Sequence, residues 1–376
     1  IAFIQRLKSL VFCYVCHKTL FCPTSLSLIF SLNNYLFYEV ILILMREAMF
    51  YSPINGDVKC HLCRHECRIA GNKRGICGVR ENRDGKLYSL VYGKAISYHV
   101  DPIEKKPLFH FLPGSTSFSF ATAGCNFSCL HCQNWEISQL PHEKKEILGM
   151  DLSPEEIVEL ARKYRCESIS YTYTEPTIFY EYAYDTAKLA NKEGIKNIFV
   201  TNGYTGEDAL REISPYLDAA NIDLKGFTEG FYKKVCGAKL KPVLDNIKLY
   251  IELGIWIEVT TLLIPGYNDK DVKPIARFLK DVGENIPWHV TGSHPEYKLL
   301  NVEPTAPESL VTARKIGLAE GLKYVYTGNV PGLEGENTYC PGCGTLLIKR
   351  IGFNVEIKDF KAGKCKKCGT RIAGVF

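Results

Sequence analysis

Three cysteines in a short loop form the pattern with the clearest chemistry. They are Cys125, Cys129 and Cys132, spaced C-x3-C-x2-C between Gly124 and Trp135. A site that only holds structure normally uses four ligands, which close the tetrahedral coordination of zinc. Three thiolates instead predict a four-iron cluster with one iron left open to a ligand from outside the protein. The loop is therefore the predicted reaction centre, and a zinc knuckle that borrows His131 or another cysteine is the alternative.

A second set of cysteines lies near the C-terminal end. Cys340, Cys343, Cys365 and Cys368 form two C-x2-C pairs that 21 residues separate. Four thiolates in this pattern predict a closed tetrahedral site for zinc, or for one iron as in rubredoxin, in a zinc-ribbon-like module. The expected role is folding, because so small a module has little core of its own. A role in electron supply is the alternative.

A third set lies upstream of the loop. Cys60, Cys63, Cys67 and Cys77 follow the irregular spacing C-x2-C-x3-C-x9-C. The spacing predicts a metal of undefined identity, either an auxiliary iron–sulfur cluster or a second zinc ion. Short spacings in a large chain favour metal binding in a reducing compartment over a disulfide framework, so we expect a cytoplasmic protein.

Composition bounds the rest. A chain of 376 residues with 46% hydrophobic residues can bury a large core, and it exceeds the usual size of one domain. The net charge of +5 is small for this length, so no nucleic-acid partner is expected. Cys166 and Cys236 stand outside the cysteine sets and are expected to be buried small side chains.

The first residues differ from the rest. The first methionine is Met45, and only four charged residues precede it, so we interpret residues 1–48 as a non-native upstream extension. A membrane span at 19–38 is interrupted by Pro23 and several polar residues, so no membrane partner is expected. A signal peptide would need a small-residue cleavage site after its apolar core, which this stretch lacks. Residues 13–17 match the C-x-x-C-H haem-attachment pattern, but that pattern requires export, which no other feature of the sequence supports.

Short apolar runs alternate with amphipathic stretches from about residue 117 to 328. The runs are β-branched or aromatic and nearly uncharged, as strands buried on both faces require. The predicted strands are 117–123, 168–174, 197–201, 219–225, 255–264, 288–290 and 323–326. Ser153-Pro-Glu-Glu156 predicts a capped helix start, and Gly194, Gly254 and Gly321 predict helix ends.

This alternation predicts an α/β fold with a parallel sheet and right-handed crossovers. About six units with polar residues at the carboxyl ends of strands indicate a partial (β/α)6 barrel. The predicted domains are an N-terminal Cys-rich segment at 49–110, the barrel at 111–330 and the four-cysteine module at 331–376, with a linker at 331–335.

The loop resembles the signature of radical S-adenosylmethionine (SAM) enzymes. Tyr-Thr-Tyr-Thr-Glu-Pro-Thr at 171–177, Thr-Asn-Gly at 201–203 and Asp-Leu-Lys at 223–225 resemble the branch typified by pyruvate formate-lyase activating enzyme. Four further stretches resemble the radical SAM member of the AmmeMemoRadiSam system, and they are 60–67, 287–290, 326–332 and 335–344. The resemblance spans roughly residues 59–375.

The resemblance implies the ligands of the site. Cys125, Cys129 and Cys132 would bind a [4Fe–4S] cluster whose open iron is chelated by SAM. Glu175 would help hold the methionine amino group, while Asp223 and Lys225 would address the ribose and carboxylate. Asp223 and Lys225 share one face of a strand, so a structural ion pair is the alternative for them.

Two positions depart from the resembled pattern. Tyr173-Thr174 precedes Glu175 where many relatives carry two glycines, and Val200 stands where activating enzymes often carry aspartate. His289 lies inside a predicted strand, where a core histidine and a SAM or substrate contact are both open. His294 is a weaker candidate. No catalytic side chain is predicted beyond the cofactor ligands.

The resemblance also implies the reaction. It implies reductive cleavage of SAM to a 5′-deoxyadenosyl radical that abstracts hydrogen from a substrate, with a flavodoxin- or ferredoxin-type one-electron donor. The activating-enzyme branch implies a glycine in a partner protein as substrate, and a small molecule stays open. A non-catalytic protein with several zinc sites is the alternative from another class.

Overall fold

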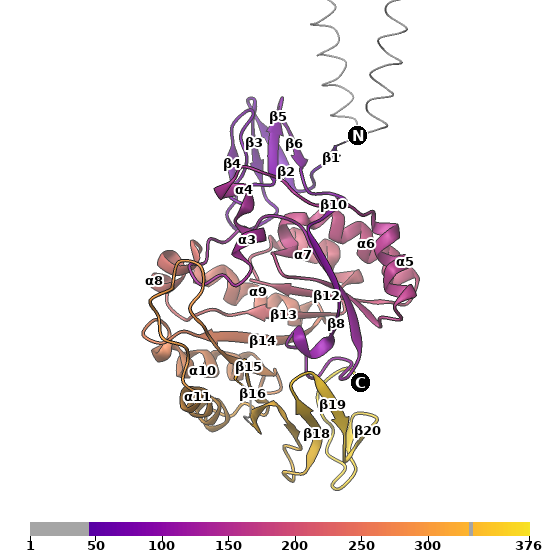
Figure 1. Ribbon diagram of the computed structural model, residues 1–376, viewed down its shortest axis with the longest axis vertical. Helices are drawn as coiled ribbons and strands as arrows, with labels where there is room; N and C mark the ends of the chain where they lie inside the picture. The colour runs from indigo at the N-terminus through magenta and orange to yellow at the C-terminus, as the bar shows by residue number, and fades with distance from the viewer. Residues whose placement is uncertain (1–44, 331–333) are drawn as a thin grey trace, which may run out of the picture. The chain divides into compact units, whose positions relative to one another are not determined.

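The computed structural model describes residues 45–330 and 334–376 (Figure 1). The chain divides into residues 1–46 and a compact unit from Glu47 to Phe376, and the description below concerns the second. The predicted extension, membrane span and haem-attachment pattern at residues 1–44 lie outside the described residues, as does most of the linker predicted at 331–335. In the part of the chain that is described, no helix is both long and apolar enough to cross a membrane.

An eight-stranded sheet forms the centre of this unit, in the order β16-β15-β14-β13-β12-β11-β9-β8. Strand β9 and strands β11 to β16 run parallel and follow chain order, and β8 (Ser97–Pro102) pairs antiparallel with β9. The parallel strands are β9 (Thr116–Ala121), β11 (Ser168–Tyr171), β12 (Lys196–Thr201), β13 (Ala219–Asp223), β14 (Trp256–Leu263), β15 (Trp288–Gly292) and β16 (Val325–Gly328). The predicted parallel α/β sheet is confirmed.

The two faces of the sheet differ in chemistry. Phe120 of β9 packs its ring 5.2 Å from Tyr171 and 5.1 Å from Tyr182 of a covering helix. Ser117, an odd-numbered residue of the same strand, pairs its hydroxyl with Ser170 at 2.6 Å. Because side chains alternate along a strand, one face packs against helices and the other presents buried polar groups.

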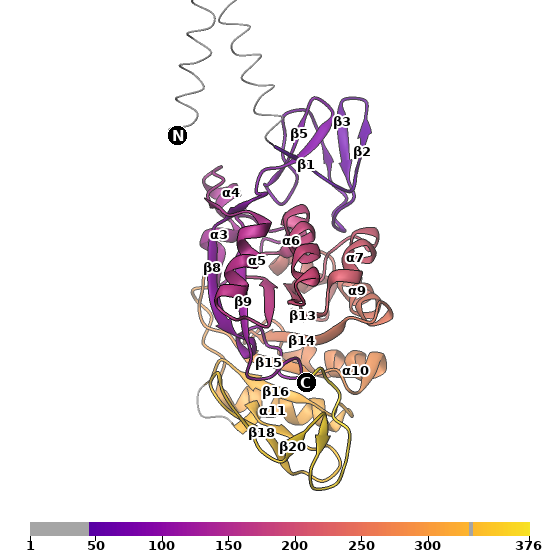
Figure 2. The same cartoon turned by 90° about the vertical axis from the view of Figure 1, so that its right-hand side faces the viewer.

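Helices connect the parallel strands (Figures 1 and 2). They are α5 (Pro154–Lys163), α6 (Tyr180–Lys192), α7 (Glu207–Ile213), α9 (Leu240–Glu252), α10 (Val272–Gly283) and α11 (Pro307–Ala319). The predicted cap of α5 is confirmed, since Ser153 Oγ accepts from the Glu156 amide at 3.2 Å and Glu156 accepts from the Ser153 amide at 2.6 Å. Gly194, Gly254 and Gly321 have positive φ just beyond α6, α9 and α11, as predicted.

Shorter helices lie in the connections. These are η1 (Ile103–Lys105), α3 (Trp135–Ser138), α4 (Leu140–Glu143), η2 (Pro176–Phe179), η3 (Ser214–Tyr216), α8 (Glu229–Phe231), η4 (Tyr232–Cys236), η5 (Asp269–Asp271) and η6 (Glu334–Glu336). The segment η4 is a π-helix, a conformation often found at functional sites.

The N-terminal segment consists of short strands that the sequence did not predict. They are β1 (Arg46–Glu47), β2 (Tyr51–Ile54), β3 (Asp57–Cys60), β4 (Arg68–Ile69), β5 (Arg80–Arg83), β6 (Lys86–Ser89) and β7 (Lys94–Ala95). Strands β2, β3 and β4 form one antiparallel sheet, β5 and β6 form a hairpin, and β7 pairs with β10 (Met150–Asp151). Runs of two to four residues are too short for an apolar period to emerge.

The C-terminal module contains β17 (Thr338–Tyr339), β18 (Leu346–Ile351), β19 (Asn354–Ile357), β20 (Phe360–Lys361) and β21 (Lys364–Cys365). Strands β18 and β19 pair antiparallel. The module has a small core of its own that includes Leu347 and Phe360 and continues into Tyr326 of β16. Arg350 Nη2 donates to the Phe109 carbonyl at 2.7 Å, which ties the module to the segment after η1.

Candidate cluster-binding site

The cysteine loop begins where β9 ends. Cys129 is buried, and Cys125 and Cys132 are half-buried. The backbone amides of Ser128 and Leu130 donate to the carbonyls of Cys236 and Val235 at 3.0 and 2.9 Å. The loop thus lies at the carboxyl end of the first parallel strand, pinned by the π-helix η4.

Gly124 fixes how the loop leaves the strand. Its φ is +101°, and a Cβ there would lie 2.6 Å from Val79 Cγ1 and 3.0 Å from the Cys77 carbonyl oxygen. Only glycine fits this close approach without displacing the N-terminal segment. The loop and the segment that holds Cys77 are therefore packed backbone against backbone.

Glu175 lies four residues beyond the end of β11, at the start of η2, and is only 2% exposed. Its Oε1 accepts from the Thr177 amide at 3.1 Å, the Thr177 hydroxyl at 2.6 Å and the Thr201 hydroxyl at 2.7 Å, and its Oε2 accepts from the Asn202 amide at 2.8 Å. Burial raises the pKa of Glu175, although these donors oppose the rise. Only one donor reaches Oε2, which as a carboxylate oxygen has about two acceptor positions, so Oε2 keeps room for one further donor.

The Thr-Asn-Gly motif joins this carboxylate to the loop. Asn202 Nδ2 donates to Asn126 Oδ1 at 2.7 Å, directly after Cys125. Among the described residues, the buried Asn126 Nδ2 has no hydrogen-bond partner. Iron–sulfur sulfurs accept such N–H donors, and these bonds tune the cluster. The donor set of the loop therefore fits a cluster.

Asp223 and Lys225 form an ion pair at the tip of β13. Lys225 Nζ donates to Asp223 Oδ2 at 2.7 Å, and both side chains keep partial exposure. The Lys225 amide donates to the Tyr232 hydroxyl at 3.1 Å, so η4 also holds this tip. The ion pair foreseen as the alternative is present, and its exposed atoms leave the ligand role open to test.

Cys236 is buried, as the sequence predicted. A hydrogen bond from its thiol lowers the pKa of the Cys129 thiol. Tetrahedral zinc with bonds of about 2.3 Å brings its sulfurs within about 4 Å of one another. Across 45–330 and 334–376, the loop thiols and Cys236 form no group of three or more candidate ligands at single-ion spacing.

The departure at Tyr173 has a structural reason. Tyr173 has a φ of +61°, a conformation that glycine adopts freely. Its hydroxyl donates to Asp101, which also accepts from Lys106 Nζ at 2.6 Å, and its carbonyl accepts from Asn134 at 2.8 Å. These contacts offset the backbone strain. The sequence did not single out Asp101 or Lys106, because both lie far from Tyr173 along the chain.

Burial and hydrogen bonds together set the pKa values of Asp101, Lys106 and His131. Burial alone would raise the pKa of Asp101, but hydrogen bonds from Lys106 and Tyr173 outweigh it and hold the pKa below its usual range. Burial lowers the pKa of Lys106 to about 8 despite Asp101. Burial also lowers the pKa of His131 to about 3, so this loop histidine is neutral at pH 7.

His289 and His294, the two histidine candidates, take no part in the hydrogen bonds described above for the cysteine loop. His289 Nε2 and Glu258 Oε2 lie 2.7 Å apart, and both side chains are buried. This pairing favours the core interpretation of His289. His294 is exposed.

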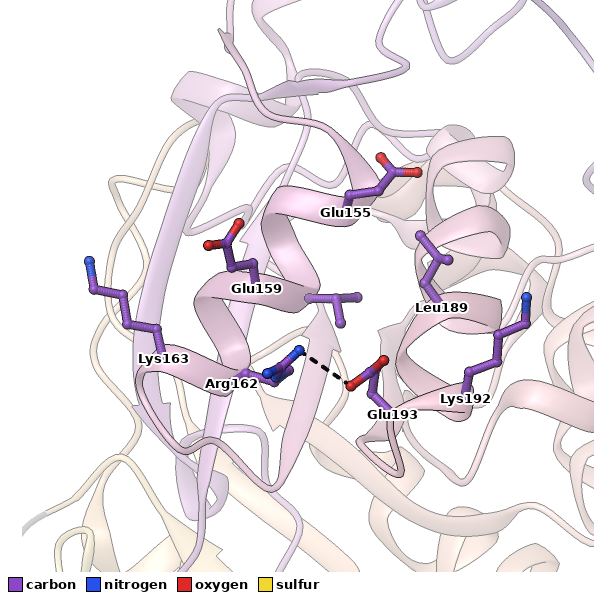
Figure 3. Close-up of a pocket in the computed structure, with 8 residues that line it drawn as sticks. Glu155, Glu159, Arg162, Lys163, Leu189, Lys192 and Glu193 are labelled. Atoms are coloured by element: carbon purple, nitrogen blue, oxygen red, sulfur yellow. Dashed lines mark ion pairs between the residues drawn. The ribbon is translucent and has the colours of Figure 1, made fainter.

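A groove between α5 and α6 is lined by exposed charged side chains, including an Arg162–Glu193 ion pair at 3.5 Å (Figure 3). None of the predicted site residues lines it. Solvent-exposed charges on two outer helix faces form no recognisable catalytic or binding arrangement, so we assign no role to this groove.

The C-terminal cysteines gather as the sequence predicted. The ligand atoms of Cys340, Cys343, Cys365 and Cys368 all lie within 4.8 Å of one another. Two sulfur pairs, Cys340–Cys368 and Cys343–Cys365, are 3.5 and 3.8 Å apart. These separations match four thiolates around one metal ion.

Comparison with known proteins defines the class. Residues 120–279 match the Radical SAM superfamily, a stretch that contains the cysteine loop and the tips of β11, β12 and β13. The chain is 52% identical over 334 residues to an uncharacterized protein of Methanocaldococcus jannaschii. The aligned region covers 87% of this chain and 99% of that protein.

Two further relatives narrow the branch. One, from the same organism, carries the provisional name glycyl-radical enzyme activating enzyme and is 30% identical over 54% of this chain and 78% of its own length. The pyruvate formate-lyase-activating enzyme of Clostridium pasteurianum is 22% identical over 48% of this chain and 78% of its own length. The chain belongs to the radical SAM superfamily, in the branch that resembles pyruvate formate-lyase activating enzyme. Membership implies a [4Fe–4S] cluster and SAM.

Proposed function

We propose that this chain is a radical SAM enzyme acting on a substrate that is not yet identified. The observation that carries the proposal is the hydrogen-bonded connection from the cysteine loop to the neighbouring strand tips. It runs from Asn126 through Asn202 to Glu175. When bound, the cluster and SAM supply a 5′-deoxyadenosyl radical that abstracts hydrogen from the substrate.

The chain's own residues would bind and orient the cofactors. Cys125, Cys129 and Cys132 would hold the cluster, and the buried Asn126 amide would donate to it. The free acceptor position on Glu175 Oε2 suits an ammonium group, while Lys225 suits a carboxylate and Asp223 a ribose hydroxyl. Phe127 and Tyr204, whose rings lie 5.1 Å apart, would exclude water behind the loop.

The proposal also covers the barrel shape of the sheet and the nature of the C-terminal module. We take the sequential sheet to be the wall of a partial barrel, because polar side chains of neighbouring strands bond across its inner face, as Asn221 does with Thr260 at 2.8 Å. We take the C-terminal module to be a zinc ribbon with a folding role. The domain boundaries at residues 48, 110 and 330 stay predictions.

The names of the relatives support a protein substrate. Two relatives are named as activating enzymes, one of a glycyl-radical enzyme and one of pyruvate formate-lyase, so we propose a glycine of a partner protein as the first substrate to test. A flavodoxin- or ferredoxin-type protein would supply single electrons. The chemistry is equally compatible with a small molecule, which the same assay can detect.

Anaerobic turnover tests the proposal. The full chain, reconstituted with iron and sulfide and reduced with dithionite, should convert SAM to 5′-deoxyadenosine and methionine. A cluster-replete sample that forms no 5′-deoxyadenosine would contradict the enzyme assignment and favour a non-catalytic metalloprotein. Product that survives Cys129→Ala would remove the loop from the mechanism. Deuterium transfer from labelled candidate substrates into 5′-deoxyadenosine would then identify the substrate.

A further inference from the structure

The four N-terminal cysteines line one cavity. Cys60, Cys63, Cys67 and Cys77 approach it from β3, from the loop between β3 and β4 and from the loop before β5. The rest of the wall consists mainly of apolar side chains, which include Leu62, Ile69, Ile76 and Ile178. Free thiols that converge on an enclosed apolar space from three segments form a built site rather than a chance surface cluster.

The N-terminal cysteines are not gathered as closely as the C-terminal four. The C-terminal cysteines bring four ligand atoms within 4.8 Å of one another, and no other group of three or more candidate ligands in the described ranges does so. Tetrahedral zinc requires sulfur separations near about 4 Å. The N-terminal thiols instead surround a space between them, as the corner ligands of a larger inorganic centre would.

A buried cation in the wall lacks one partner. Arg80 is 2% exposed, and its Nη1 donates to Glu181 at 2.9 Å. Its Nε has no partner among the described residues, although the side chain belongs to the wall of the cavity. An unpaired buried donor of a charged group costs about 1–3 kcal/mol or more. A dianionic cluster with sulfide acceptors would satisfy it.

The cavity shares a wall with the proposed SAM site. Thr177 lines the cavity and donates to Glu175 at 2.6 Å. Its hydroxyl is also 2.7 Å from that of Thr205, whose backbone pairs with Cys63 in an antiparallel bridge. One layer of threonine side chains therefore separates the N-terminal cysteines from the carboxylate at the tip of β11.

The N-terminal segment also touches the cysteine loop directly. A Cβ on Gly124, which precedes Cys125, would lie 3.0 Å from the Cys77 carbonyl oxygen. His65 Nε2, between Cys63 and Cys67, lies 2.8 Å from the Asn126 carbonyl oxygen. The two cysteine sets are thus neighbours through contacts at the residues before and after Cys125.

We propose that Cys60, Cys63, Cys67 and Cys77 bind a second [4Fe–4S] cluster beside the SAM site. A role for the second cluster beside the SAM site rests on the proposed function. Binding of the second cluster does not depend on that function. Each [4Fe–4S] cluster accepts one electron from an external donor such as dithionite, with no bond made or broken and no proton transferred. The reconstituted chain therefore stores two electrons, not one.

Removal of the loop ligands isolates the second cluster. The full chain with Cys125→Ala, Cys129→Ala and Cys132→Ala keeps the N-terminal site intact. After anaerobic reconstitution it should retain about four irons and four sulfides, against about eight of each in the wild type. Reduction with dithionite should take up one electron per chain, and the electron paramagnetic resonance spectrum of the product should not change when SAM is added. No iron, or a second zinc in its place, would overturn the proposal.

The reciprocal variant provides the matching measurement. Cys60→Ser with Cys77→Ser should also retain about four irons, but its reduced spectrum should change with SAM, because only the loop cluster has an open iron. Cys166→Ser, a change at a buried cysteine outside every set, is the control and should keep about eight irons. Zinc at the C-terminal site and an unchanged circular dichroism spectrum report that each variant is folded.

The two proposals fail in different ways. A triple loop variant that keeps its cluster supports the second site even if the wild type forms no 5′-deoxyadenosine. A wild type that forms 5′-deoxyadenosine while the triple variant binds no iron supports the enzyme and contradicts the second cluster.

Discussion

The cysteine loop and the C-terminal module hold thiols in opposite ways. In the module, four sulfurs already lie within 4.8 Å of one another, at the ends of short antiparallel strands. In the loop, three thiols emerge from one strand end, and the hydrogen bonds around them come from other strand tips. A closed site needs only its own ligands, whereas an open site needs neighbours that orient both the metal centre and what binds to it.

This difference separates folding from chemistry. The module is a satellite with a small core, so a bound ion contributes directly to its folding free energy. The loop is part of the main core and does not depend on a metal to place Glu175 or Asn202. Loss of metal should therefore unfold the C-terminal module, whereas at the cysteine loop it should only abolish activity.

Cys129→Ala should give the largest effect. It tests most directly whether the cysteine loop serves chemistry and the C-terminal module serves folding. Without this buried ligand the cluster should not assemble, and formation of 5′-deoxyadenosine should fall by more than about a thousandfold. The melting temperature of the chain without iron should stay within a few degrees of the wild type. A large drop in melting temperature would show that the loop holds structure as the module does.

Cys365→Ala should give the converse result. This ligand is 2% exposed, and its loss should release the C-terminal ion and lower the free energy of unfolding of the module by more than about 4 kcal/mol. Thermal unfolding and zinc content measure both effects, with Cys166→Ala as the control for the loss of a buried thiol. An unchanged melting temperature after loss of the ion would refute the folding role.

Glu175→Gln tests the neighbours on which the loop depends. The amide keeps the shape of the side chain, but one oxygen becomes a donor that faces the donors of Thr177 and Thr201 or of Asn202. We expect about a tenfold higher KM for SAM and a loss of stability of about 1–3 kcal/mol. Thr312→Ala, at an exposed helix position, is a control that should change neither quantity. A normal KM would mean that Glu175 only braces the strand tips.

His110 should make the docking of the module sensitive to acid. Its Nδ1 donates to the Ala373 carbonyl at 2.6 Å, and its Nε2 accepts from the Tyr326 hydroxyl at 2.5 Å. Burial lowers the pKa of His110 to about 4, below the value of about 6.5 in an unfolded chain. The unfolded chain therefore takes up the proton first, and stability present above pH 6.5 is lost as the pH falls.

Denaturant unfolding of the chain without iron can measure this loss. Between pH 6.5 and 5 the contribution of His110 should decrease by about 2 kcal/mol. His110→Gln should be less stable at neutral pH and should show a flatter dependence on pH over the same interval. An unchanged slope in the variant would assign the acid sensitivity to another group.

Local patterns explain why much of the fold was predictable. Each buried parallel strand is a run with at most one charged residue, flanked by turn residues, and Ser153 and Gly194 mark helix ends through their own backbone preferences. Such preferences depend on neighbours within one turn, so they are readable in the chain. Strands of two residues, as in β4 and β7, have no period to read and were missed.

The site was predictable only in part, for the same reason. The resemblance of the loop and strand-tip motifs identified the cysteines and Glu175, but not Asp101, which lies 72 residues from Tyr173, or Cys236 beside Cys129. These contacts join separate strands and helices. No local preference encodes them.

The sequence by itself determined the ligand types, their spacing and the parallel α/β class, because these follow from covalent order and local hydrophobic pattern. Only the tertiary structure decided which thiols gather at the spacing of one ion and which surround a cavity. It also decided that Tyr173 is held in a glycine-like conformation and that the N-terminal cysteines adjoin the loop. The distance between sulfurs depends on how separate strands pack, and packing is a property of the whole folded chain.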